Sequence, residues 1–337
     1  MEDAESLLGK PRGREPDVYQ KKMLLLLTAC ALWLTSNPAS AVTIDWVTVG
    51  NPGNACDVPV SGACIGAVAD TYRIGRHQVT NAQYAEFLNA KAASDTLGLY
   101  SSNMGSGVGG ITRSGSFGSY TYSPIVGREN MPVTYVSFWD SARFANWLHN
   151  GQGSGDTETG AYTLLGGTAA PSNGLGVTRN AGATIFLPIM DEWYKAATYD
   201  ASTASFFDYA TGSDTPPTCA SPGAAPNTAN CANVVGDFTA VGSYTGSASP
   251  YGTFDQGGNA FEWNENPTGG GNRRYFMGSF YGASSPTGMT ASNLGNAVPT
   301  SESDIVGFRV ASLPEPGTGL LLLTGLLALA GSRRRCV

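Results

Sequence analysis

The chain has 337 residues and a net charge of −7 at pH 7; 44 residues are glycine and 13% are charged. The acidic balance excludes nucleic acid as an expected partner, because neutralising phosphates requires clustered Lys and Arg. High glycine content with little charge favours turns and irregular backbone over long surface helices, so we predict a loop-rich fold.

The first 41 residues have the pattern of a secretory signal peptide. Lys21 and Lys22 precede an apolar run at residues 24–34, and a small-residue triplet ends at Ala41. We therefore expect export with cleavage after Ala41. A lipoprotein cleavage site, with Cys30 as the lipidated residue, is the alternative.

Three helices are predicted after this segment from capping signals and apolar spacing. Thr80 and Gln83 form a capping box for the first helix. Ser137 is a good N-cap for the second helix, which should end at Asn150, and the third begins after Pro188. Short strands are expected at 42–49, 72–78, 238–243 and 308–312, and long surface loops at 96–122 and 151–182.

Four cysteines lie between residues 42 and 313, namely Cys56, Cys64, Cys219 and Cys231. In an oxidising compartment four cysteines can pair in three ways. Proximity in the sequence favours Cys56 with Cys64 and Cys219 with Cys231. Their spacing does not match that of a metal site, such as a Cys-x-x-Cys pair.

The last 24 residues combine three features in a fixed order. These are Pro314, Glu315 and Pro316, then an apolar run at 317–331, then Arg333, Arg334 and Arg335. The run of about 15 residues is short for a bilayer core, which takes roughly 20, and arginines after it favour the cytoplasmic side. This order resembles the PEP-CTERM sorting signal of Gram-negative bacteria. The resemblance implies transient membrane anchoring, recognition by an exosortase, and delivery to the cell surface, outer membrane or extracellular matrix; a plain tail anchor is the alternative.

Five segments occur in an order that resembles one family: residues 72–90, 132–137, 187–193, 251–263 and 307–310. This family is the formylglycine-generating enzyme domain, also called the sulfatase-modifying factor family. The resemblance covers roughly residues 43–312. It implies an α+β fold, a variant of the C-type lectin-like architecture with little regular secondary structure. The expected organisation is a signal peptide at 1–41, the family domain at 42–313 and a sorting signal at 314–337.

The copper-binding cysteines of the family are missing from the segment that should carry them. Members that oxidise a sulfatase cysteine to formylglycine hold copper(I) with two cysteines after a Gly-Gly-Ser-aromatic motif. Here the frame at Gly278 and Ser279 is kept, but Gly282 and Thr287 stand about where those cysteines would fall. Copper(I) needs soft thiolate ligands. The second cysteine pair is expected away from this segment, in a loop before residues 251–263, so we expect no copper and disfavour oxidase activity.

Residues 255–262 are the best metal-site candidate. The resemblance implies a structural calcium site formed by the side chain of Asp255, the carbonyls of Gly258 and Ala260, and the carboxylate of Glu262. Hard oxygen ligands in a tight glycine-rich loop are what calcium requires. In the alternative, Glu262 pairs with Arg309 beneath the loop, and both could hold. A second family calcium loop would fall at Asn233 and Val234.

The two histidines are predicted to be structural. The related ergothioneine-type sulfoxide synthases join this domain to an iron-binding helical bundle with several histidines, whereas this chain has only His77 and His149. We place His77 in a strand and His149 at a helix end, where a cation is favourable to the helix dipole. Four tryptophans are predicted to belong to the core rather than to a sugar groove: Trp139, Trp147, Trp193 and Trp263.

Two functional hypotheses arise from these features. In the first, the chain is a surface-sorted, disulfide-stapled and calcium-stabilised binding or matrix protein, whose partner is an exopolysaccharide or a surface protein. In the second, it is a formylglycine-generating-type oxidoreductase with a divergent active site, indicated by the frame around Gly278 and Ser279.

Overall fold

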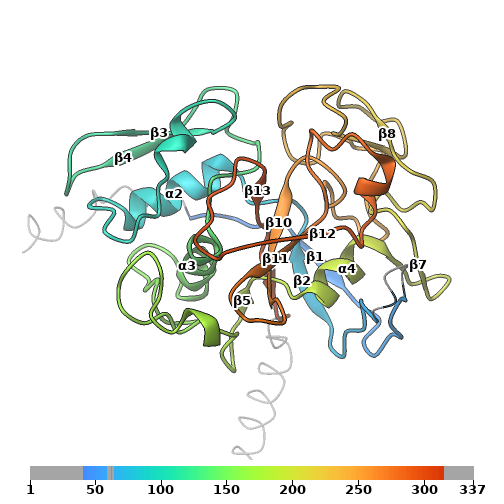
Figure 1. Ribbon diagram of the computed structural model, residues 1–337, viewed down its shortest axis with the longest axis horizontal. Helices are drawn as coiled ribbons and strands as arrows, with labels where there is room; N and C mark the ends of the chain where they lie inside the picture. Colours follow the sequence, from blue (N-terminus) through green and yellow to red (C-terminus); the bar gives the residue numbers. More distant parts are fainter. Residues whose placement is uncertain (1–40, 59–61, 63, 315–337) are drawn as a thin grey trace, which may run out of the picture. The chain divides into compact units, whose positions relative to one another are not determined.

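The structure is a computed structural model that describes residues 41–58, 62 and 64–314 (Figure 1). The first of two four-stranded sheets has the antiparallel order β1 (Trp46–Val49), β2 (Tyr72–Gly75), β14 (Ala311–Ser312), β5 (Ile185–Phe186). The second has the order β12 (Leu294–Ala297), β11 (Arg274–Met277), β10 (Phe261–Pro267), β13 (Val306–Gly307), with β10 and β13 parallel. Both sheets join strands from distant parts of the chain, so the fold depends on long-range closure.

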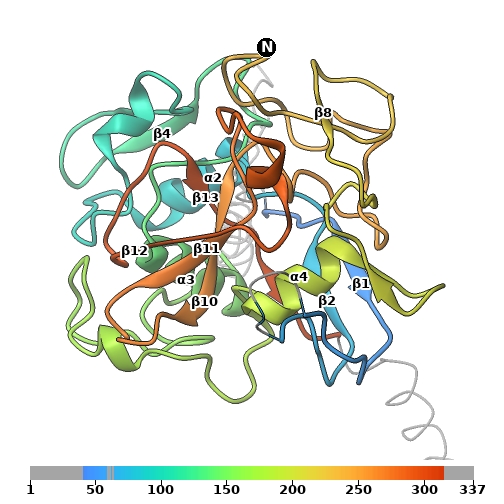
Figure 2. The ribbon, with the colours of Figure 1, turned by 45° about the vertical axis from the view of Figure 1, so that its right-hand side comes forward.

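Three described helices form where their capping signals predict them. α2 (Asn81–Lys91) begins after Thr80, whose side chain accepts the Gln83 N–H, and α3 (Phe138–His149) begins after Ser137, which forms a capping box. α4 (Met190–Thr198) begins two residues after Pro188. In both views α3 lies beside β5 and α4 lies against β10 (Figures 1 and 2). The result is a mixed, sheet-rich fold with few helices.

An aromatic cluster joins α2, α3 and the chain before β14. The rings of Phe87 and Phe144 have centroids 5.4 Å apart, and Phe308 lies 5.3 Å from Phe144 and 6.3 Å from Tyr84. Burying a large apolar side chain contributes about 1.5–3 kcal/mol. The four tryptophans predicted for the core are all at most 3% exposed, namely Trp139, Trp147, Trp193 and Trp263.

Local structure departs from prediction in three places. The segment predicted as a loop at 96–122 contains η1 (Ser102–Gly105) and a hairpin of β3 (Ile111–Ser114) and β4 (Thr121–Pro124), the last of which ends beyond it. No strand forms at 238–243, where the backbone is held by turns and side-chain contacts. His77 lies in a bend after β2 rather than in the strand, because β2 ends at Gly75. The 151–182 segment is a long loop, as predicted, with one short helix, η2 (Gly174–Gly176).

The remaining elements are short. They are the pair β6 (Tyr199–Asp200) and β7 (Ser205–Phe206), the pair β8 (Thr218–Cys219) and β9 (Thr228–Ala229), and η3 (Pro286–Met289). Most of the chain between residues 199 and 260 is therefore irregular, as the composition predicted.

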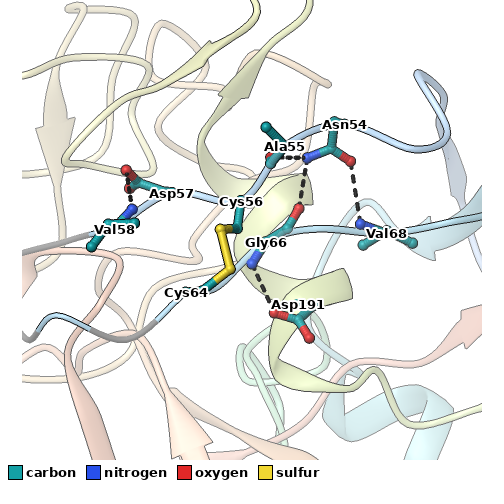
Figure 3. The surroundings of a disulfide bond; sticks show 9 residues. All are labelled: Asn54, Ala55, Cys56, Asp57, Val58, Cys64, Gly66, Val68 and Asp191. Atoms are coloured by element: carbon teal, nitrogen blue, oxygen red, sulfur yellow. Dashed lines mark hydrogen bonds between the residues drawn. A yellow bond between two sulfur atoms is a disulfide. The ribbon is translucent and has the colours of Figure 1, made fainter.

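Both disulfides favoured by sequence proximity are confirmed. Cys56 bonds to Cys64 and Cys219 bonds to Cys231. Figure 3 shows that the first disulfide lies beside a polar contact between distant segments, in which the Gly66 N–H donates to Asp191 of α4 at 2.8 Å. Each disulfide therefore closes a loop next to a long-range contact.

The predicted signal peptide and most of the predicted sorting signal, including Glu315, Pro316 and the three arginines, lie outside the described residues. Within the described ranges, no helix is both long enough and apolar enough to cross a bilayer.

Candidate functional site

The glycine-rich loop before β10 has an unusual backbone. Asp255 and Asn259 adopt left-handed conformations, each with a φ of 62°, which non-glycine residues rarely do. Gly258 has a φ of 136°, and a Cβ there would lie 2.8 Å from the carbonyl oxygen of Asn230. A tight turn packed against residue 230 therefore requires glycine at this position.

Glu262, the predicted carboxylate ligand on β10, forms a buried ion pair with Arg309. Arg309 donates from Nε to Oε2 at 2.5 Å and from Nη2 to Oε1 at 2.6 Å, and Trp193 Nε1 donates to Oε2 at 2.6 Å. Arg309 also donates to the carbonyls of Gly75 and Phe254, each at 2.9 Å. The alternative pairing predicted for Glu262 is present, and both carboxylate oxygens accept N–H groups.

The other predicted calcium ligands divide into two sets. The carbonyl of Ala260 accepts from Gln78 Nε2 at 2.8 Å, beneath the loop. The carboxyl of Asp255 accepts from the Gly242 N–H at 2.7 Å, and burial raises its pKa to about 6 despite that hydrogen bond. The structure thus brings Asp255 and Gly258 to one cavity, while Ala260 and Glu262 make interior contacts elsewhere.

This cavity has a volume of about 10 Å³, enough for one water-sized occupant. Besides Asp255 and Gly258, its lining includes Asn230, Ser247 and Tyr244. Asn230 is 2% exposed, and its Oδ1 atom has no hydrogen-bond donor. An orphaned amide oxygen beside a carboxylate is a donor set of hard oxygens, which fits a hard cation or a water molecule.

Asn230 was not predicted as a site residue. It reaches the loop because the Asn259 N–H donates to its carbonyl at 3.1 Å, and its Nδ2 donates to Asn259 Oδ1 at 3.1 Å. The two residues are 29 positions apart, so no local sequence signal could have paired them.

The second predicted calcium loop lies against a different segment. The Asn233 N–H donates to the Tyr281 carbonyl at 2.9 Å, and Val234 is 51% exposed. Across the described part of the chain, no group of three or more His, Cys, Asp or Glu side chains is arranged to hold a metal ion. Any calcium in this region would therefore depend on amide, hydroxyl and backbone oxygens beside one carboxylate.

The segment after β11 holds the positions where copper-binding cysteines would fall. Ser279 is fully buried, and its hydroxyl has no hydrogen-bond partner. A Cβ on Gly282 would lie 2.5 Å from the ring of Phe280, which packs against Phe261 with ring centroids 5.8 Å apart. Thr287 lies in η3. A cysteine at 282 would therefore require Phe280 to move.

The expectation that the second cysteine pair lies away from this segment was wrong. Cys219 and Cys231 pack in one cluster with Ala283 and Met289, and the Ala232 N–H donates to the Ala283 carbonyl at 2.8 Å. The chain folds back there, so a loop before residues 251–263 meets the stretch after β11. Each of the four cysteines in the described ranges is nevertheless bonded to another, so none offers a thiolate.

The histidines lie apart from each other and from the cavity lining. His77 stacks on Phe254 with ring centroids 5.6 Å apart, and burial lowers its pKa to about 4, so it is neutral at pH 7. His149 ends α3, and its Nδ1 accepts the Thr184 N–H at 3.1 Å. These contacts are those of structural side chains.

Comparison with known proteins identifies one family and several similar folds. The sequence model described as the sulfatase-modifying factor enzyme 1-like domain matches residues 62–313. The crystal structure of CarF is 22% identical, with a TM-score of 0.56 over 82% of this chain and 100% of that chain. Treponema denticola variable protein 1 is 17% identical, with a TM-score of 0.53 over 82% of this chain and 97% of that chain. PvdO from Pseudomonas aeruginosa is 18% identical, with a TM-score of 0.46 over 81% and 93%. No curated protein matches the sequence.

Proposed function

The chain belongs to the sulfatase-modifying factor enzyme 1-like family, and we propose that it uses the family fold as a non-catalytic binding or matrix domain outside the cell. The observation that carries this proposal is the state of the cysteines. All four in the described ranges are in disulfides, and the Phe280 ring occupies the space beside position 282. Copper(I) chemistry of the family type needs a soft thiolate pair, which these residues do not supply.

Location and architecture complete the proposal. The signal-peptide pattern at residues 1–41 and the Pro-Glu-Pro, apolar and arginine order at 314–337 support export, exosortase processing and display at the surface or in the matrix of a Gram-negative bacterium. We further propose that the fold is a C-type lectin-like variant, in which long loops form the binding surface on a disulfide-stapled scaffold.

The β3–β4 hairpin supports a binding role. At its tip Phe117 is 71% exposed, and the guanidinium of Arg113 lies 4.4 Å from the ring centroid of Tyr120 and 4.9 Å from that of Tyr100. Aromatic and arginine side chains dominate the energetics of binding surfaces. The proposed partner is an exopolysaccharide or a surface protein that stacks on this hairpin.

A glycan array and a pull-down of surface proteins, both with the purified protein, test the binding role. Phe117→Ser should weaken any binding found at least tenfold. Val126→Ser is the matched control, because Val126 is 91% exposed and lies outside the hairpin. Absence of any ligand in both assays would contradict the proposal.

The alternative is a formylglycine-generating-type oxidoreductase with a divergent site. The buried, unpartnered hydroxyl of Ser279 is the observation that favours it, because buried polar groups without partners often mark functional positions. A sulfatase-motif peptide, incubated with the protein and added copper under oxygen, distinguishes the two functions. Peptide oxidation with matching oxygen consumption would establish the enzyme and overturn the binding proposal.

Calcium is proposed as a structural ligand at the cavity beside Asp255. Asp255, Asn230 and the backbone at Gly258 would hold it, and the bound ion would neutralise the Asp255 carboxylate. With only one carboxylate we expect weak affinity, on the order of 10⁻⁴–10⁻³ M.

Thermal unfolding tests this site. Millimolar calcium should raise the unfolding temperature at pH 7.5 and lose its effect below pH 6, because Asp255 has a pKa raised to about 6 and becomes protonated there. Asp255→Asn should abolish the shift, and Asp208→Asn, which changes a carboxylate outside the cavity lining, should preserve it. An unchanged shift in Asp255→Asn would place the ion elsewhere.

A further inference from the structure

The outer face of the first sheet carries apolar side chains where a solvated sheet usually carries polar ones. Strand register puts Val47, Ile74, Ala311 and Phe186 on the core face. The opposite face presents Trp46, Thr48, Arg73, Ser312 and Ile185, because Thr48 pairs with Arg73, Arg73 with Ser312, and Ser312 with Ile185. Trp46 and Ile185 are only half-buried there.

A groove of about 570 Å³ lies over this face. Its walls are mainly apolar and include Val42, Ile44, Trp46, Ile185, Leu313 and Pro314. Volumes of 300–1,000 Å³ with mainly apolar walls are typical of sites that bury a ligand's side chains or rings. The groove is therefore suited to aliphatic side chains.

Arg73 holds the end of β14 at the groove. Its Nε donates to Ser312 Oγ at 3.1 Å and its Nη2 to the Leu313 carbonyl at 3.3 Å, while its guanidinium lies 5.6 Å from the ring centroid of Trp46. These contacts bring the chain to the groove wall at Leu313 and Pro314. Residues C-terminal to Pro314 must therefore start from that wall.

We propose that the groove is a docking site for the chain's own apolar segment, residues 317–331. Two residues separate this segment from Pro314, and three peptide steps span at most about 10 Å. The segment contains seven leucines, and burying a leucine contributes about 1.5–3 kcal/mol. A short link keeps its local concentration in the millimolar range. In water the segment docks in the groove, and a bilayer competes for it.

Photo-crosslinking in the full chain tests the docking. A photoreactive amino acid replaces Ile185, and the protein is irradiated in detergent-free buffer and analysed by mass spectrometry. We expect crosslinks to residues 317–331, and an equal mixture of isotope-labelled and unlabelled protein should show that they form within one chain. The same probe at Val126, an exposed position outside the groove, should give fewer than one tenth as many.

A second pair of variants separates docking from misfolding. Leu322→Asp should lower the Ile185 crosslink yield at least fivefold, whereas Leu322→Met should preserve it, and both changes lie outside the family domain. Added phospholipid vesicles should move the crosslinks from the groove to lipid. Crosslinks only to solvent, crosslinks mainly between chains, or lipid as the sole product in every condition would each overturn the proposal. A yield that is equal for the aspartate and methionine variants would do the same.

Discussion

The pairing of Glu262 with Arg309 decides the chemistry of the predicted metal loop at the level of single residues. Both side chains are at most 1% exposed, and both oxygens of the carboxylate accept donors. A buried ion pair contributes little net stability compared with an apolar pair, but removing one member leaves an uncompensated charge. Glu262 therefore holds Arg309 in place in the interior, and Asp255 is the carboxylate that faces the cavity.

Glu262→Gln should destabilise the protein by about 3–5 kcal/mol, because the Arg309 charge loses its counter-ion in the interior. Urea denaturation in chelator-containing buffer at pH 7 measures the change. The matched control is Asp45→Asn, since Asp45 pairs with Arg76 at 2.7 Å with its side chain 60% exposed. That variant should change stability by less than about 1 kcal/mol. Equal effects of the two substitutions would contradict a buried charge requirement.

His77 should make stability depend on pH in the acidic range. Burial, followed by the charge of Arg309, lowers its pKa from 6.5 to about 4, while Asp45 opposes this and Arg76 adds to it. Between pH 6.5 and pH 4 the unfolded chain therefore binds a proton that the folded chain does not, so stability is lost as pH falls through this window. Since His77 is partly solvated, we expect a loss of about 1–2 kcal/mol.

His77→Gln should remove that part of the pH dependence. Urea denaturation of both proteins at pH 6.5, 5 and 4 measures it, and the difference between them should shrink as pH falls. His149→Gln provides a control for the loss of a histidine at a helix end. Parallel stability curves for His77→Gln and the unmodified chain would show that His77 is not responsible.

At the scale of elements, the Cys219–Cys231 disulfide supports the segment C-terminal to β11. It packs against Ala283 and Met289, and adjacent backbone hydrogen bonds join residues 232 and 233 to this segment. A disulfide in this family fold therefore braces the stretch where a copper site would otherwise lie.

Replacing Cys219 and Cys231 together with alanine should destabilise the protein by about 2–4 kcal/mol and accelerate amide exchange in residues 281–289. Hydrogen exchange with mass spectrometry measures both effects regionally. In the matched control, Cys56 and Cys64 become alanine, and faster exchange should appear near Gly66 instead. If residues 281–289 exchange equally fast in both variants, the brace is not local.

The helices were predicted well and the hairpin was not, for different physical reasons. Capping at Thr80 and Ser137 involves residues three positions apart, so the sequence carries the whole signal. The β3–β4 hairpin lies in a segment rich in glycine and serine, and its Ile111 and Tyr122 are buried only because α2 covers the hairpin. Tertiary packing supplied the apolar environment that local composition did not indicate.

At the scale of the whole molecule, the end of the domain completes the first sheet. β14 lies between β2 and β5, so residues 311–312 join strands that begin at residues 72 and 185. The buried Phe308 and Arg309 precede it by a few residues. The last residues of the domain therefore close contacts made across its full length.

Truncation should show a sharp boundary there. A chain ending after Leu313 keeps β14 and should unfold cooperatively with unchanged stability, apart from any contribution of tail docking. A chain ending after Val310 should lose on the order of 3 kcal/mol or more, because β2 and β5 lose their shared partner and its backbone hydrogen bonds. Tryptophan fluorescence during urea denaturation compares the two. Equal midpoints would mean that β14 is dispensable.

The sequence by itself determined the family, the helix starts and the pairing of cysteines 8 and 12 residues apart, because each depends on an ordered motif or on neighbours along the chain. Only the tertiary structure decided that Glu262 faces Arg309, that Asn230 meets the Asp255 loop, and that a disulfide lies beside Ala283. Those contacts join segments 25 to 52 residues apart. Which of many such closures forms depends on the packing of the entire core, and no local pattern records it.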